Sequence, residues 1–276
     1  MHQTASEMRT RHDDPAAPET GSTPASPMYD RLFVIAGLAG IVAVSWAYLM
    51  IEAGRMGSTD MVAMVELRPR DATGLILLFL MWAVMMVAMM LPSATPTLLL
   101  YAAIARKLSP ELNQGVVTAA FALGYIVAWT VFSLVATFLQ WGLEQLTLLS
   151  PMMKSSSYSL GGVLLIAAGM YQWTPAKDIC LKHCQTPLLF IAQRWRSGAD
   201  GALWLGLTHG LYCIGCCWVL MGLLFVGGVM NLLWVAAIAI FVLIEKAAPF
   251  GRETGRGVGL LLIVTGIYVF ASSFAV

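Results

Sequence analysis

Seven separate apolar stretches constrain this chain more than any other feature. They are residues 32–51, 74–101, 116–140, 158–173, 203–225, 231–245 and 257–274. Each meets or approaches the roughly 20 mostly apolar residues that a helix needs to cross ~30 Å of lipid hydrocarbon. Charged residues make up 11% of the chain, less than half of the roughly 25% in soluble domains. The sequence therefore predicts an all-α, polytopic integral membrane helix bundle with about seven transmembrane helices.

The distribution of Lys and Arg predicts the orientation of this bundle. Twelve of the 16 basic residues lie in the N-terminal tail or in the loops after the second, fourth and sixth stretches. An odd number of crossings puts all of these segments on one side of the membrane, and cytoplasmic loops carry an excess of Lys and Arg. We therefore expect the N-terminus inside, the C-terminus outside and a multi-pass location in a bacterial inner membrane.

The rest of the chain divides into few parts. Residues 1–31 are polar and rich in Pro, Ser and Thr, which predicts a disordered tail before a transmembrane domain of residues 32–276. The basic segment 174–200 contains the run PLLFIAQRWR, which predicts a helix on the cytoplasmic membrane face. A net charge of +1 offers no field to attract nucleic acid. No nucleotide-binding or serine-hydrolase motif is present, and the sequence identifies no catalytic residue.

The fifth apolar stretch carries a His and three Cys within nine residues. His209, Cys213 and Cys216 fall within about 60° on a helical wheel, and Cys217 widens this face to about 100°. Cys also packs as a small hydrophobic residue. A His in hydrocarbon is costly and by default functional, and imidazole and thiolate bind soft and borderline metals. The spacing therefore predicts a metal-binding face.

The second apolar stretch carries stripes of methionine. Met81, Met85 and Met89 are spaced by four residues, and Met86 and Met90 form a neighbouring stripe. Methionine often only fills gaps in a core, but thioether sulfur is also a ligand for Cu(I). We therefore predict Met85, Met89 and Met90 as weaker ligands or a relay.

Depth in the membrane makes this pairing testable. With a rise of ~1.5 Å per residue across a ~30 Å core, three pairs of residues from the two stretches fall at equal depth. These pairs are His209 with Met89, Cys213 with Met85, and Cys216 with Met81. The two sets of side chains are therefore expected in the same slab of the bilayer.

A second thiol motif lies in the basic loop. Cys180 and Cys184 flank Leu-Lys-His and share a face if the segment is helical. Thiols on the cytoplasmic side stay reduced, so this pair is predicted to meet a cytosolic metal donor or acceptor. An inert or redox-responsive pair is the alternative. The odd total of five Cys argues against a framework of structural disulfides.

Polar and helix-breaking residues also interrupt the apolar stretches. Glu245 and Lys246 end the sixth stretch and predict an ion pair whose long side chains reach the inner interface. Pro92 and Pro96 break the hydrogen-bond ladder of the second stretch, and the hydroxyl side chains that we expect to satisfy freed carbonyl groups are those of Ser93, Thr95 and Thr97.

Together these motifs resemble a bacterial family. They are W-x-x-M-x-x-A-M-M-x-P from Trp82, C-L-x-x-C from Cys180, H-G-x-Y-C-x-G-C-C-W from His209, and G-G-x-M-N from Gly227 followed by the pair Glu245-Lys246. In these motifs the chain resembles the predicted metal-binding integral membrane proteins of domain of unknown function 2182 (DUF2182). The resemblance covers residues 74–246 and implies metal binding in the membrane.

The leading hypothesis is a membrane protein that handles, delivers or transports a soft transition metal. Copper as Cu(I) is favoured, with zinc as the alternative metal, and a cytosolic metallochaperone or another membrane subunit is the expected partner. Two other classes remain open. One is a membrane thiol–disulfide protein, although no Cys lies in an outer loop; the other is a non-catalytic subunit in which Cys and Met only pack.

Overall fold

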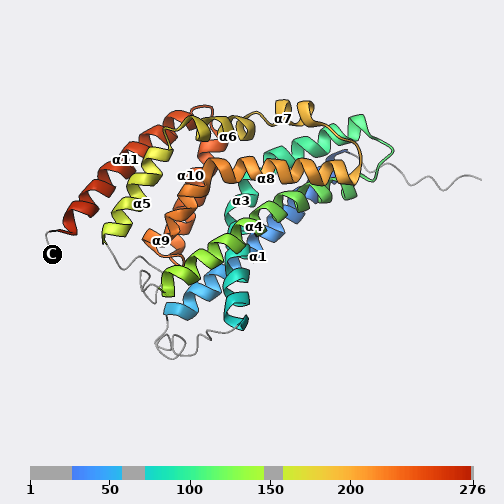
Figure 1. Cartoon of the computed structure of the whole chain (residues 1–276). Coiled ribbons are helices and arrows are strands. Elements are labelled where there is room, and N and C mark those ends of the chain that lie inside the picture. The colour runs from blue at the N-terminus through green and yellow to red at the C-terminus, as the bar shows by residue number, and fades with distance from the viewer. Residues whose placement is uncertain (1–26, 58–71, 146–157, 275–276) are drawn as a thin grey trace, which may run out of the picture.

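The computed structural model describes residues 27–57, 72–145 and 158–274, and all regular structure within these ranges is helical. The helices are α1 (Pro27–Gly57), α3 (Ala72–Leu108), α4 (Gln114–Gln145), α5 (Tyr158–Tyr171), α6 (Pro175–Gln185), α7 (Pro187–Arg194), α8 (Gly198–Gly222), α9 (Leu224–Gly227), α10 (Leu232–Ala247) and α11 (Gly251–Ser272) (Figure 1). The predicted all-α bundle is confirmed. Most of the predicted N-terminal tail, residues 1–26, lies outside the described residues.

Each of the seven predicted stretches coincides with a helix. Among the described residues, five helical segments are long and apolar enough to cross a membrane: Val34–Gly54, Ala72–Leu108, Gln114–Gln145, Gly198–Gly227 and Gly251–Ser272. The chain is therefore a helical membrane protein. With 14 and 16 residues, α5 and α10 are shorter than a full crossing needs. The number of crossings, the orientation and the particular membrane stay predictions.

Small residues let α4 and α8 approach each other at backbone distance. A Cβ atom at Gly206 would overlap the carbonyl oxygen of Phe121, and one at Gly124 would overlap that of Leu203. Gly210 lies against the methyl group of Ala128 in the same crossing. Membrane helices favour small residues where they pack closely, because apolar side chains gain little by leaving lipid. This crossing fixes the face of α8 that carries His209.

The two prolines interrupt α3 without ending it. Pro92 removes the donor for the carbonyl group of Ala88, and the indole Nε1 of Trp46 on α1 donates to that oxygen at 3.2 Å. The hydroxyl groups of Ser93 and Thr95 donate to the carbonyl oxygens of Met90 and Leu91 at 2.9 and 3.0 Å. The carbonyl groups that the two prolines leave without a donor are those of Ala88 and Pro92, so the expectation that neighbouring hydroxyl groups satisfy the freed carbonyl groups is not met by Ser93 and Thr95.

Two short helices connect α5 to α8. Thr174 caps α6, its hydroxyl accepting a hydrogen bond from the N–H of Lys177 at 3.3 Å, and Pro187 opens α7. Both helices lie along one side of α8, and α6 packs against it (Figure 1). The predicted segment 174–200 thus consists of α6, α7 and the start of α8. Its position on the cytoplasmic membrane face stays a prediction.

Candidate metal centre

Both sets of predicted ligands face the interior of the bundle. His209 is 2% exposed, and Cys213, Cys216 and Cys217 are at most 1% exposed. The methionines of α3 between residues 85 and 90 are equally buried. Neither set points toward lipid, which is the first condition for a shared site.

The sulfur atom of Cys213 on α8 contacts side chains of α4 and α10. Its Sγ lies 3.0 Å from the hydroxyl group of Tyr125 on α4 and 2.8 Å from Nζ of Lys246 on α10. Tyr125 also hydrogen-bonds to the carbonyl oxygen of Met90 at 3.0 Å, and Lys246 donates to the hydroxyl of Ser93 at 3.2 Å. Cys213 is therefore held by polar groups that tie α8 to α3, α4 and α10.

The thioether of Met90 is the sulfur of α3 that meets a thiol of α8. Its Sδ lies 4.0 Å from Sγ of Cys217, and both side chains are fully buried. Met85 and Met89 lie buried on the same helix, and their role as ligands stays a prediction.

The predicted pairing by depth is displaced along the helices. Met90 and Ser93 stand level with Cys213 and Cys217, whereas the sequence paired Cys213 with Met85. Relative to these contacts the predicted register is displaced by about eight to ten residues, or ~12–15 Å at ~1.5 Å per residue. The estimate took the ends of the apolar stretches as the membrane boundaries, but α3 has 37 residues and exceeds a crossing.

His209 has a buried nitrogen atom without a partner. Its Nδ1 makes no hydrogen bond in the part of the chain that the structure describes. The imidazole packs among the rings of Phe121, Tyr125 and Phe190, with centroids 6.1, 5.7 and 5.5 Å away. A buried polar atom that lacks a partner costs free energy, so an imidazole here fits a metal ligand better than a packing residue.

The two cysteine motifs of the sequence meet in space. The thiol of Cys184 on α6 lies next to that of Cys216 on α8, close enough for the two groups to interact. Sγ of Cys180 would lie 2.6 Å from a Cβ atom at Gly215, so this thiol packs directly against the backbone of α8. The neighbouring Cys216 thiol and burial raise the pKa of the Cys184 thiol well above its ordinary value, and burial raises the pKa of Cys180. The sequence predicted two separate thiol motifs, and the fold brings them together.

The predicted interfacial ion pair of Glu245 and Lys246 is wrong. Glu245 is completely buried and pairs with Lys177 of α6, with Nζ and Oε1 2.5 Å apart. Lys177 also hydrogen-bonds to Gln172. Lys246 turns toward Cys213 instead, because successive residues of a helix point about 100° apart and both directions lead into the bundle here. The sequence also predicted no role for Tyr125.

The donor atoms do not form a closed coordination shell. Among the described residues, no group of three His, Cys, Asp or Glu side chains lies close enough to hold a metal ion. The thiols of Cys216 and Cys217 both donate to the carbonyl oxygen of Cys213 at 3.0 Å, so they follow the helix rather than converge. The sulfur atoms instead stand in pairs, Cys184 with Cys216 and Cys217 with Met90. Sulfur donors arranged in pairs suit copper better than zinc, because a structural zinc site needs four ligands.

These features define a class: a helical membrane protein with thiol, thioether and imidazole groups buried where its helices meet. The comparison with protein families then names the group. The chain belongs to the family described as PpoB2: copper chaperone, whose model matches residues 79–269 and so spans every candidate ligand. The match supports the expectation of a copper-related membrane protein, whereas the resemblance to DUF2182 stays a prediction and zinc gains no support. No curated protein and no solved structure matches the chain.

Proposed function

We propose that this protein takes up Cu(I) at thiols between α6 and α8 and passes it to sulfur ligands inside the bundle for delivery through the inner membrane. The observation that carries the proposal is the contact of Cys184 with Cys216. It joins a short connecting helix to a long apolar helix through two atoms that are ligands for soft metals. A cytosolic metallochaperone or a second membrane subunit would supply or receive the metal.

The uptake step is supported by the exposure of the thiols. Cys180 is half-buried, whereas the other four Cys are buried. It therefore offers a first sulfur ligand, next to Gly215 and one helical turn from Cys184. Cu(I) moves between sulfur ligands by exchange, gaining one bond as it loses another, so ordered neighbouring sulfur atoms support transfer from Cys180 to Cys184 and Cys216.

The inner step is supported by the contact of Cys217 with Met90. Cys217 follows Cys216 directly, and its Sγ lies 4.0 Å from the thioether. A thioether carries no charge and binds Cu(I) less firmly than a thiolate, which suits a ligand that must release the metal. Met89 and Met85 continue the series of thioethers along α3. His209 offers its unpartnered nitrogen one turn from Cys213.

Lys246 would supply a compensating charge. Its ammonium group contacts Cys213 at 2.8 Å in surroundings that exclude water. Two thiolates binding Cu(I) carry a net charge of −1, and an uncompensated charge is costly in a buried site. We therefore assign Lys246 a positioning role rather than a place among the ligands.

The test is an anaerobic titration of the purified full chain with Cu(I) in competition with a chromogenic chelator. We expect tight binding by the native protein and a loss of affinity of about 100-fold for Cys216→Ser. Met90→Leu is expected to lose about tenfold. Met170→Leu is the matched control, because Met170 is 55% exposed on α5 and should leave binding unchanged. Negligible binding by the native protein, or equal binding by all variants, would refute the proposal.

One observation also favours a thiol–disulfide function. Cys184 and Cys216 are neighbours on different helices, as an exchangeable pair requires. Trapping of free thiols in growing cells separates the two functions. A redox protein would hold a fraction of this pair oxidised, whereas a copper carrier would hold both thiols reduced or metal-bound.

A further inference from the structure

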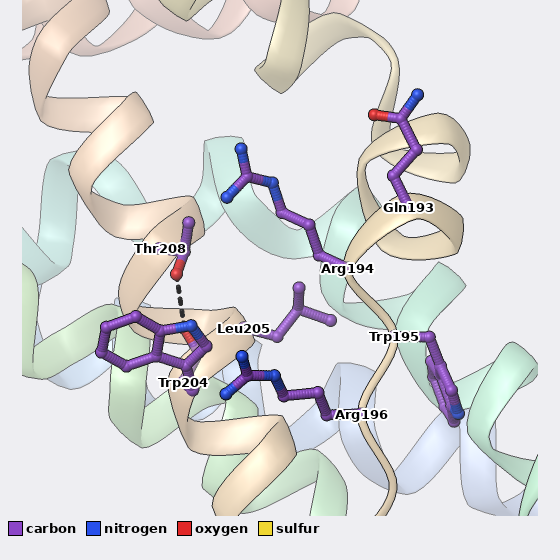
Figure 2. A pocket seen from close by; sticks show the side chains of 7 residues that line it. All are labelled: Gln193, Arg194, Trp195, Arg196, Trp204, Leu205 and Thr208. Atoms are coloured by element: carbon purple, nitrogen blue, oxygen red, sulfur yellow. Dashed lines mark hydrogen bonds between the residues drawn. The ribbon is translucent and has the colours of Figure 1, made fainter.

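A second site lies apart from the sulfur ligands, between the end of α7 and the first turns of α8. It is a pocket of about 230 Å³ whose walls include Arg194, Arg196, Trp204, Leu205 and Thr208 (Figure 2). We propose that this pocket binds the phosphate group of an anionic membrane phospholipid. The proposal does not depend on copper.

Two arginines give the pocket its charge. In Figure 2 the side chains of Arg194 and Arg196 extend to the same side, toward α8, with Leu205 between them. The lining contains no Asp or Glu, so no carboxylate neutralises the pair from within the pocket. Guanidinium groups bind phosphate oxygens through two parallel N–H donors each, and a phosphate between two of them would use both.

Arg194 is held in place before any ligand arrives. One of its N–H groups donates to the hydroxyl of Tyr212 at 2.8 Å, and its guanidinium lies 5.4 Å from the centroid of that ring. The ring of Tyr212 is held in turn by His183, which stacks on it with centroids 4.0 Å apart. Because the side chain is already ordered, less entropy is lost when its remaining donors bind a ligand.

Arg196, unlike Arg194, has no partner for its guanidinium group among the described residues. It forms no ion pair and no side-chain hydrogen bond within the described residues, whereas Arg252 and Arg256 on α11 both pair with Asp178. Arg196 is also exposed and therefore accessible to a ligand. One ordered and one unpaired guanidinium in the same pocket point to an external anion.

The surroundings favour a lipid over a free phosphate. Leu188 and Leu189 of α7 are 61% and 56% exposed, and Trp204 beside the arginines is 54% exposed. Trp is enriched where membrane headgroups meet hydrocarbon. An anion that brings acyl chains would cover this apolar surface while its phosphate contacts the arginines, and basic pockets next to membrane helices bind such headgroups.

The experiment measures lipid binding to the full chain in detergent by native mass spectrometry, with phosphatidylglycerol and phosphatidylcholine as probes. We expect phosphatidylglycerol to bind at least about tenfold more tightly than phosphatidylcholine, and Arg194→Gln/Arg196→Gln to abolish this preference. Arg196→Gln alone is expected to weaken it several-fold. Since the guanidinium group of Arg196 has no ion pair or hydrogen bond within the described residues, this variant should keep the native melting temperature.

The control removes the same charge elsewhere. Lys107→Gln/Lys182→Gln deletes two exposed cations outside the pocket and should keep the preference. An equal loss in both double variants, or retention in both, would overturn the proposal. A parallel titration with inorganic phosphate identifies the source of the anion: displacement of the lipid by low millimolar phosphate would overturn the assignment to a lipid, and its absence supports it.

Discussion

Two tightly packed regions of this molecule are built in opposite ways. Between α5 and α11, glycines bring the two backbones together, so that a Cβ atom at Gly169 would lie 2.5 Å from the carbonyl oxygen of Gly259. At the junction of α3, α6, α8 and α10, the contacts are made by Cys213, Lys246 and Glu245. Figure 1 shows α5 and α11 side by side near the C-terminus, with α10 leading toward the junction.

The difference between the two regions shows which buried residues helix packing explains and which it does not. The α5–α11 contact shows that this chain holds helices together by backbone contact without any buried charge. Burying an ammonium and a carboxylate costs several kcal/mol per ion unless each is paired, so packing alone gives no reason for Lys246 and Glu245 to lie inside the bundle. Thiols in contact with that ammonium therefore call for a chemical explanation, and copper handling provides one.

The largest effect on stability is expected from leaving one buried charge at the junction unpaired. Glu245→Leu strands the buried ammonium of Lys177 and should cost about 3–5 kcal/mol of stability. The double variant Lys177→Met/Glu245→Leu removes both charges and should recover most of that loss. Thermal unfolding in detergent measures both variants. A double variant as unstable as the single one would show that the ion pair is not the source of the effect.

The next largest effect is expected from adding side-chain volume where the glycines of α5 and α11 meet. Gly169→Val places its side chain against the backbone of Gly259 and Ile263 and should cost about 3 kcal/mol through overpacking. Gly142→Val is the matched control, because a Cβ atom at Gly142 meets nothing within 4 Å. Melting temperatures of the two variants check this. If copper affinity falls in the folded fraction of Gly169→Val, the separation of packing from chemistry is wrong.

The sequence predicted which residue types lie at the junction of α3, α6, α8 and α10 better than it predicted the contacts between them. Helical spacing placed His209, Cys213 and Cys216 on one face, because a wheel depends only on the geometry of a single helix. The contact of Cys184 with Cys216 was missed, since it depends on how α6 folds back along α8. For the same reason the partners of Glu245 and Lys246 could not be read from their neighbours in the chain.

A smaller effect sharpens the role of Tyr125. Tyr125→Phe keeps the ring beside His209 but removes the hydroxyl that contacts Cys213 and the carbonyl oxygen of Met90. We expect a loss of about 1–2 kcal/mol of stability and Cu(I) affinity within a few-fold of the native value, because the hydroxyl positions the sulfur rather than binds the metal. A chelator competition assay on the folded variant measures the affinity. A loss as large as that of Cys216→Ser would make Tyr125 a ligand.

The smallest effect tests whether α1 supports the junction from a distance. Trp46→Phe keeps an aromatic side chain but removes the donor that satisfies the carbonyl oxygen of Ala88, which Pro92 leaves free. A buried carbonyl without a donor costs about 1 kcal/mol, so the melting temperature should fall by a few degrees. If α3 is held near Met90 by its own contacts, Cu(I) affinity should stay unchanged. A parallel fall in affinity would instead show that the course of α3 at Pro92 sets the position of the thioether.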